Sequence, residues 1–265
     1  MAGPDPGWIP VNAPPLAQGR ARPLVATFLE RPHRFAAICR RRDGEVVAAH
    51  VPNPGRLTGV LAPRCTVLLD GPFPPPRSLL YTMLAARPAD GWIGTNTLYA
   101  NRVFPALVSH GLFPELGSRL GAVRAEVAHG RSRFDFQLGK TLVEVKSVTL
   151  AATRSAARAG RRSAAAGSDR GAATARVGAF PDAVSARAAR HCDELAALAR
   201  ARRRAAIVFV AQRGDVASVA PADDIDPDFG AAIRAASAAG VLVLACALDM
   251  TPAGATRARR IPVHL

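Results

Sequence analysis

The chain has 265 residues, of which 49% are hydrophobic, 21% charged and only 5% aromatic, and its net charge is +15. This length accommodates one large domain or two ordinary ones, and the composition excludes a disordered or fibrous chain. A positive surplus this large favours polyanionic partners, with nucleic acid first and an anionic membrane surface second.

Two origins of the charge stay open, because a GC-rich genome also loads a chain with Arg. Residues 151–178 carry six Arg and one Asp, so this segment holds +5 of the charge and +10 remains elsewhere. The four cysteines lack metal or redox spacing, the N-terminus lacks a signal-peptide pattern, and no apolar run could span a bilayer. We therefore expect a cytoplasmic protein without a membrane partner.

The first third of the chain reads as short strands. Residues 1–23 are rich in Pro and Gly and are predicted to form a flexible N-terminal segment. Residues 24–80 contain three β-like runs, and Asp43-Gly44 supplies a hairpin turn between the second and third, which is typical of a small barrel or sandwich. The proline-rich stretch 72–76 is predicted to be a stiff connector, with the domain boundary within 71–84.

The second domain, residues 81–265, is predicted to be a mixed α/β sheet, because antiparallel strands come first and strands alternating with helices follow. Residues 151–178 lack apolar periodicity and are expected to be a disordered insertion. The expected elements are a helix near 97–110 that Pro105 must end or kink, the strands VRAEVA, SRFDFQL and TLVEVKSV, a helix over 183–201, a buried strand over 205–211, a helix capped by Asp226, and a buried strand over 241–248.

The sequence SRFDFQL-GK-TLVEVKSV is predicted to be a β-hairpin. Gly139-Lys140 is a two-residue loop with Gly first, as a type II′ turn requires. Counting back from this turn pairs Phe136 with Val143, and Asp135 with Glu144. Two carboxylates that face each other directly in a sheet repel, so this register calls for a compensating cation.

Asp135, Glu144 and the Val145 carbonyl are accordingly our candidate ligands for Mg²⁺ or Mn²⁺, with Asp135, Glu144 and Lys146 as candidate catalytic residues. An ion, two carboxylates and an ammonium suit hydrolysis of a phosphodiester. The alternative is a solvated strand face on which Arg133 and Lys146 balance the two acids. The chain has 33 Arg and only two Lys, and one of those two stands in the candidate site, which favours the functional interpretation.

The chain resembles the sugar fermentation stimulation protein family from about residue 24 to residue 263. The resemblance implies an N-terminal OB-like barrel, a restriction-endonuclease-like C-terminal domain of the PD-(D/E)XK type, DNA binding, and a regulatory role in sugar (maltose) utilisation. The motifs that carry it are His50-Val51-Pro52-Asn53-Pro54-Gly55-Arg56-Leu57, Gly94-Thr95-Asn96-Thr97 with Asn101, Ser132-Arg133-Phe134-Asp135-Phe136, Val143-Glu144-Val145-Lys146-Ser147-Val148-Thr149-Leu150, Phe180-Pro181-Asp182-Ala183, and Gln212-Arg213.

The chain departs from the family pattern at several positions. The 151–178 insertion separates motifs that are normally close, and the basic pair of the connector is reduced to Arg77-Ser78. The first helix lacks the acid that often completes a metal site in this fold, and Glu115 or Glu126 are the candidate substitutes. His191, on the amphipathic helix, is expected at the surface or at its boundary.

The candidate nucleic-acid-binding residues come from the barrel loops and from the ends of strands, where polar groups can reach phosphates. For the 50–56 loop, a purely structural turn is an equally good interpretation. Two functions stay open: a metal-dependent phosphodiesterase acting on DNA, and a non-catalytic DNA-binding regulator, in either case with a homodimer as one candidate assembly. The candidate nucleic-acid-binding residues are His50, Asn53, Arg56, Arg77, Arg133, Gln212 and Arg213.

Overall fold

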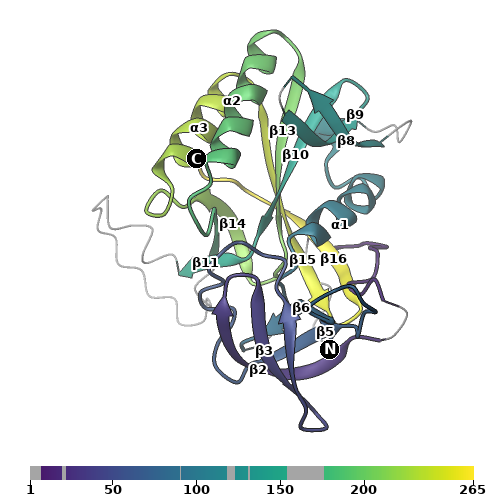
Figure 1. Ribbon diagram of the computed structural model, residues 1–265. Coiled ribbons are helices and arrows are strands. Elements are labelled where there is room, and N and C mark those ends of the chain that lie inside the picture. The colour runs from purple at the N-terminus through teal and green to yellow at the C-terminus, as the bar shows by residue number, and fades with distance from the viewer. Residues whose placement is uncertain (1–6, 20–21, 90, 118–122, 131, 154–175) are drawn as a thin grey trace, which may run out of the picture.

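A computed structural model of the chain describes residues 7–19, 22–89, 91–117, 123–130, 132–153 and 176–265. Two lobes are visible in Figure 1: a β-barrel below, and a larger sheet with helices on both faces above. This confirms the expected fold class, an OB-like barrel followed by a mixed α/β domain. No helix within the described ranges is long and apolar enough to cross a membrane.

The barrel closes through five strands in the order β2-β3-β4-β6-β5-β2, and the short β7 adds to β6. Closure depends on the parallel pairing of β4 with β6, which leaves the barrel without a free edge. The hairpin turn is found where Asp43-Gly44 predicts it, with Gly44 at a φ of +92°. The strands are β2 (Leu24–His33), β3 (Ala36–Arg41), β4 (Val46–His50), β5 (Thr66–Asp70), β6 (Tyr81–Arg87) and β7 (Ile93–Gly94).

The barrel extends beyond the boundary expected within 71–84. Strand β6 completes the barrel, and its residues Tyr81, Met83 and Ala86 are buried in the barrel core. The proline-rich stretch 72–76 is therefore a loop between two paired strands, not a connector between domains. The change of domain falls between β7 and the first helix, at about residues 95–97.

The second domain is built on a seven-stranded sheet in the order β1-β16-β15-β13-β10-β9-β8, whose central strands β10, β13 and β15 are parallel. A small sheet in the order β11-β12-β14 stands beside it. The strands are β1 (Ile9–Pro10), β8 (Val123–His129), β9 (Ser132–Leu138), β10 (Thr141–Val148), β11 (Leu150–Thr153), β12 (Arg176–Phe180), β13 (Arg204–Ala211), β14 (Val216–Pro221), β15 (Leu242–Thr251) and β16 (Gly254–Ile261).

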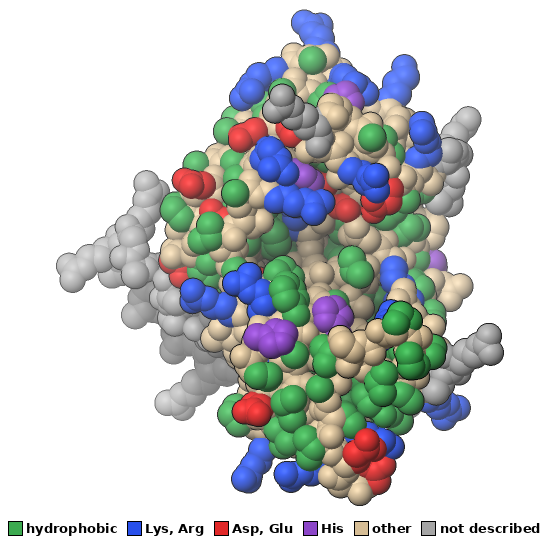
Figure 2. All heavy atoms as spheres, viewed as in Figure 1, with side chains coloured by type: hydrophobic (Ala, Val, Ile, Leu, Met, Phe, Trp, Pro, Cys, Tyr) green, Lys and Arg blue, Asp and Glu red, His purple; other side chains and the backbone are tan. Residues whose placement is uncertain are grey.

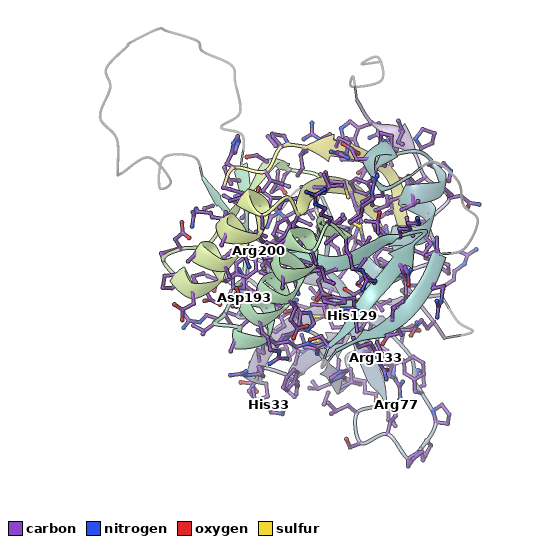
Figure 3. The ribbon with its side chains drawn as sticks, turned by 90° about the horizontal axis from the view of Figure 1, so that it is seen from above. His33, Arg77, His129, Arg133, Asp193 and Arg200 are labelled. Carbon is purple, nitrogen blue, oxygen red and sulfur yellow. The ribbon has the colours of Figure 1, made fainter. Side chains whose placement is uncertain are left out.

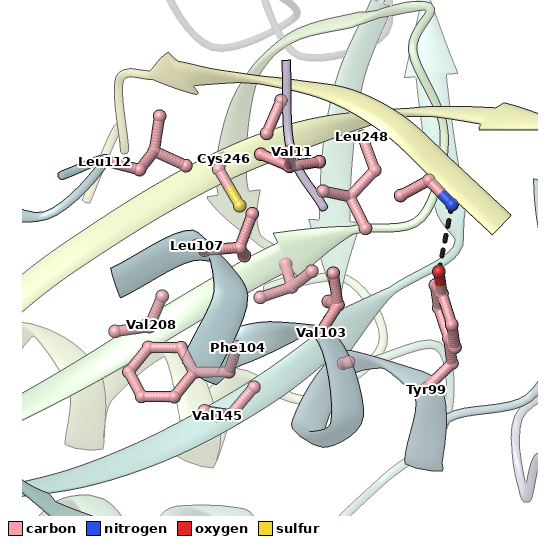
Figure 4. Close-up of a cluster of buried hydrophobic side chains, with 14 of the residues drawn as sticks. Val11, Tyr99, Val103, Phe104, Leu107, Leu112, Val145, Val208, Cys246 and Leu248 are labelled. Carbon is pink, nitrogen blue, oxygen red and sulfur yellow. Dashed lines mark hydrogen bonds between the residues drawn. The ribbon is translucent and has the colours of Figure 1, made fainter. Parts of the chain in front are cut away.

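Helices cover the two faces of this sheet (Figure 1). Helix α1 (Leu98–Ser109) packs on one face in a core that includes Phe104, Val145 and Val208, drawn in Figure 4. Helices α2 (Ala186–Arg200) and α3 (Pro227–Ala238) pack on the other face. A single 3₁₀ turn, η1 (Pro114–Leu116), follows α1.

Helix α1 continues through Pro105, so of the two expected effects of this residue, an end or a kink, the helix does not end there. Pro105 has no N–H to give to the carbonyl four residues earlier, which weakens an isolated helix. The burial of Val103, Phe104 and Leu107 against the sheet offsets that loss. Helix α3 begins as predicted, because the Asp226 side chain accepts a hydrogen bond from the Phe229 N–H at 3.0 Å.

The N-terminal segment is not loose over the residues described. Strand β1 pairs with β16, and Val11 and Leu16 are buried in the core that holds α1. The Tyr99 hydroxyl donates to the Pro14 carbonyl at 2.8 Å and accepts from the Ala255 N–H at 2.9 Å, the contact marked in Figure 4. The prediction of a flexible segment, which relied on Pro and Gly content, is therefore wrong for these residues, because Val11 and Leu16 reach the core.

The expected insertion is shorter than predicted. Thr153 pairs with Arg176 and Ala151 with Gly178 in the ladder of β11 with β12. Both ends of the 151–178 segment are thus strand residues. The central part, residues 154–175, lies outside the described residues.

Candidate metal and nucleic-acid site

The hairpin register follows the prediction for three pairs only. Leu138 pairs with Thr141, Gln137 with Leu142 and Phe136 with Val143, and the ladder then ends. Asp135 consequently does not face Glu144 across the ladder, which corrects the predicted pair. Its Oδ2 atom instead accepts a hydrogen bond from the Val145 backbone N–H at 2.8 Å, so a carboxylate takes the place of a strand carbonyl at this point.

Helix α1 supplies the second partner of Asp135. The Asn101 side-chain amide donates to Asp135 Oδ1 at 2.6 Å. The acids expected to substitute for a helix-borne ligand lie elsewhere: Glu115 pairs with Arg260 and Glu126 with Arg133. An amide from α1 therefore stands beside Asp135, in place of the carboxylate that the resemblance calls for.

Glu144 is held from both sides at a single oxygen. Its Oε1 atom accepts from Lys146 Nζ at 2.7 Å and lies 2.7 Å from His191 Nδ1. His191 comes from α2 and is only 2% exposed, which corrects its expected surface position. Its ring also meets the edge of the Phe134 ring, with the centroids 5.6 Å apart. Glu144 thus ties β10 to α2.

The two carboxyl groups have opposite pKa shifts. Burial raises the pKa of Asp135 to about 6, and the nearby negative charge of Glu144 adds to this effect. Burial also opposes ionisation of Glu144, but the hydrogen bond from His191 and the charge of Lys146 outweigh it and leave the pKa of Glu144 below its usual value. The pKa of Asp135 thus lies close to neutral pH, while Glu144 is held as an anion.

The second oxygen of Glu144 is the candidate metal ligand. Glu144 Oε2 is buried and has no hydrogen-bond partner. A buried carboxylate oxygen without a donor is costly, and a cation is one of the few groups that relieves it. No group of three His, Cys, Asp or Glu side chains gathers anywhere within the described ranges. A bound ion would therefore take two carboxylates completed by backbone carbonyl and water, as Mg²⁺ does in many proteins.

Three of the candidate nucleic-acid-binding residues are buried and serve the fold. Asn53 accepts from the Gly55 N–H and donates to the Thr95 carbonyl, which makes it a structural turn residue. Arg213 is 2% exposed and binds Asp215 and the Thr149 carbonyl. Gln212 donates to the Asn96 carbonyl and to Ser147 Oγ, both at 2.8 Å. Their positions at strand ends and in family motifs suggested contact with phosphate, but these side chains point inward.

The other four are accessible and lie in three places. His50 and Arg77 line a cavity of about 400 Å³ between the barrel and the start of α1. Arg56 lines a second cavity, of about 640 Å³, beside Arg31 and Arg34. Arg133 is exposed on β9, where it pairs with Glu126 at 3.4 Å. The structure thus brings together His50 and Arg77, but not Arg56 or Arg133.

These positions share one face of the molecule. Figure 3 shows His33, Arg77 and Arg133 toward the same side, and His33 lines the Arg56 cavity. Figure 2 shows Lys and Arg side chains above and below a hollow on this face, between the two lobes. A basic border around a hollow concentrates positive potential where a polyanion could lie.

Asn101 and His191 are the site residues that pattern reasoning missed. Asn101 belongs to a motif singled out in the sequence, but nothing local tells that its helix returns to Asp135. His191 is predicted from the sequence at the surface of the amphipathic helix or at its boundary. Its place on the Ala188, Cys192 and Leu195 side of α2 was the signal that could have found it, since these residues are all buried.

Comparison with known proteins gives consistent matches along the chain. Residues 29–95 match the family model described as the SfsA N-terminal OB domain, and residues 98–158 and 170–254 match the sugar fermentation stimulation protein RE domain. A sugar fermentation stimulation protein homolog of Symbiobacterium thermophilum is 38% identical over 96% of this chain and 98% of its own length. A Pseudomonas aeruginosa homolog of the same description is 37% identical over 95% of this chain and 98% of its own.

A solved structure resembles this one over nearly its whole length. It is described as the structure of Pyrococcus furiosus SfsA in complex with Ca²⁺, and it matches with a TM-score of 0.73 over 96% of this chain and all of that chain. At 24% identity, this likeness concerns the fold.

Proposed function

Because this chain belongs to the sugar fermentation stimulation protein family, we propose that it is a DNA-binding protein whose Asp135–Glu144 site binds Mg²⁺ or Mn²⁺ and hydrolyses phosphodiesters. The observation that carries this proposal is the buried, unpartnered Oε2 atom of Glu144, next to a second half-buried carboxylate and an ammonium. The description of the Pyrococcus furiosus relative as a Ca²⁺ complex supports it, since Ca²⁺ and Mg²⁺ both prefer oxygen ligands.

Asp135 and Glu144 would hold the ion, with the Val145 carbonyl as the expected third protein ligand. When bound, a divalent cation supplies a Lewis acid for the phosphate and lowers the pKa of a water ligand. Asn101 orients Asp135, and His191 orients Glu144. Within the described residues, Lys146 is the lysine that contacts these carboxylates. Its positive charge favours a phosphate at the site.

A cleavage assay with several DNA forms tests the proposal, with Mg²⁺, Mn²⁺ or EDTA in parallel. Wild type should cleave with Mg²⁺ or Mn²⁺ and not with EDTA, and Glu144→Ala should lose activity. Asp228→Asn is a matched control, because Asp228 is an exposed acid in the first turn of α3, outside the site. Equal cleavage by wild type and Glu144→Ala would remove the assignment.

A second candidate function is a non-catalytic DNA-binding regulator of sugar (maltose) utilisation genes. The observation that favours it is Asn101, an uncharged amide where nucleases of this fold often place a helix carboxylate. On this alternative the metal-binding residues stabilise the fold, and wild type binds DNA but cleaves none of the forms with any metal. The same assay, with DNA binding measured alongside, separates the two functions.

A further inference from the structure

The cavity between the barrel and α1 has a different lining from the second cavity, which contains Arg56. It holds about 400 Å³, near the lower end of ligand-binding pockets. Its walls combine apolar side chains with groups that can donate or accept hydrogen bonds, the mixture that a heteroaromatic ring requires. The apolar side chains are Pro52, Phe73, Leu79, Leu84 and Leu98, and the polar ones include Gln18, His50, Thr82 and Asn96.

Two planar side-chain groups, the Arg77 guanidinium and the Phe73 ring, line this cavity. The Arg77 guanidinium lies over the Phe73 ring, 4.2 Å from its centroid, and both residues line the cavity. A planar guanidinium on an aromatic ring offers stacking surface to a base. Leu98 adds an apolar side chain that is 63% exposed, which is high for a leucine at the first position of a helix.

The charge of the lining argues for a base and against a phosphate. Asp70 lines the cavity, and its carboxylate is fixed there by the N–H groups of Gln18 and Gly19. Asp70 is only 3% exposed, and its negative charge offsets the positive charge of Arg77 in the same lining, so the cavity lacks the cationic surplus that a phosphate needs. The second cavity has the opposite character, because Arg31, Arg34 and Arg56 line it with Asp224 as its one acid.

The cavity adjoins the metal-binding residues through two connections. Leu98 and Asn101 are three residues apart on α1 and so share a face of the helix, about 4.5 Å apart along its axis. The Asn96 carbonyl accepts from the side chain of Gln212, which also donates to Ser147, the neighbour of Lys146. These connections place the cavity and the carboxylate site next to each other along α1, so that one DNA strand would reach both.

We propose that this cavity binds an unpaired nucleobase and thereby selects single-stranded or locally unpaired DNA for the neighbouring carboxylate site. The inference rests on the proposed function and narrows its substrate class. A base inside a duplex is stacked and paired, so it would enter only after unpairing, at a cost that a single strand does not bear.

Binding to two short strands of equal length tests the assignment, with EDTA present so that no cleavage occurs. One strand is oligothymidylate and the other consists of abasic residues, which keep every phosphate and remove every base. Wild type should bind the thymidylate strand about tenfold more tightly. The double variant Phe73→Ala/Leu98→Ala should lose most of that ratio, while Val46→Ala/Leu265→Ala, at exposed apolar positions outside the cavity, should keep it.

The outcomes separate this inference from the proposed function. Equal binding of both strands by wild type overturns the base site, and so does an unchanged ratio in the Phe73/Leu98 variant; metal-dependent cleavage of DNA would stand in either case. Preferential binding of the thymidylate strand supports the base site; if the separate assay with Mg²⁺ or Mn²⁺ then shows no cleavage of any DNA form, the base site stands and the phosphodiesterase is removed. Failure to bind either strand overturns the base site, and the cleavage assay with duplex DNA and metal then decides the proposed function separately.

Discussion

Glu144 joins strand β10 to helix α2 at the candidate site. One oxygen receives contacts from Lys146 on its own strand and from His191 on α2, while the other is buried without a donor. The Glu144 carboxylate is therefore fixed in orientation, with its Oε2 atom available to a bound cation. The neighbouring Asp135 is equally fixed, by a backbone N–H and by Asn101.

Asp135→Asn should stabilise the metal-free protein at pH 7. The folded-state pKa of Asp135 is raised to about 6, so the stability linked to its proton is present below pH 4 and is lost as the pH rises through 6. Removing the ionised carboxyl should therefore return about 3 kcal/mol at pH 7, and this gain should shrink toward pH 4. Denaturant unfolding of both proteins at several pH values measures the difference.

The same variant tests the metal. Mn²⁺ or Mg²⁺ should raise the melting temperature of wild type by binding the folded state, and Asp135→Asn should reduce that shift. Asp228→Asn should respond as wild type does. Equal metal shifts in wild type and Asp135→Asn would show that the ion binds elsewhere or not at all.

His191→Phe should destabilise the protein by about 1–3 kcal/mol at pH 7, because it removes a buried hydrogen bond to an anion. Among the described residues, this leaves Lys146 as the one side chain that contacts the Glu144 carboxylate. The ring contact with Phe134 is kept, so packing changes little. His191→Gln retains a donor and should lose less. Free energies of unfolding give the comparison, and a larger loss in His191→Gln than in His191→Phe would mean that the ring, not the hydrogen bond, matters.

At the scale of elements, short segments join the two lobes. Strand β1 extends the main sheet at one edge, and Leu16 lies in the core that α1 shares with Leu68 and Leu84 of the barrel. The barrel and the sheet thus meet across a common apolar core as well as through the chain.

Leu16→Ala should cost about 2–5 kcal/mol of unfolding free energy, the usual loss for a fully buried leucine. Leu265→Ala is the control, because Leu265 is 42% exposed, and it should change stability by less than about 0.5 kcal/mol. Denaturant unfolding measures both. A loose N-terminal segment would instead make the two variants alike.

Residues 154–175 should be replaceable by a short turn. Thr153 and Arg176 are paired at the ends of β11 and β12, so a tight turn such as Asn-Gly can join these antiparallel strands. The replacement should not lower the free energy of unfolding by more than about 1 kcal/mol. A larger loss in thermal or denaturant unfolding would show that this segment contributes to the fold.

At the scale of the whole molecule, charge is the dominant feature, and +10 remains when residues 151–178 are excluded. DNA affinity should fall steeply with salt through counterion release, and Arg56→Gln should reduce the slope of log K against log salt by about 1. Arg42→Gln, in the turn between β3 and β4, should leave the slope unchanged. Titrations at several salt concentrations decide this, and affinity independent of salt would exclude an electrostatic interface.

The sequence by itself determined what depends on neighbouring residues. The Asp43-Gly44 and Gly139-Lys140 turns, the Asp226 cap and the buried strands followed from local signals, and the family motifs located Asp135, Glu144 and Lys146. Only the tertiary structure decided which distant groups meet them. Asn101 lies 34 residues from Asp135, and His191 lies 47 from Glu144. Such contacts depend on how helices pack across a sheet, and no local pattern specifies that packing, because many sequences with the same periodicity bury the same face against different partners.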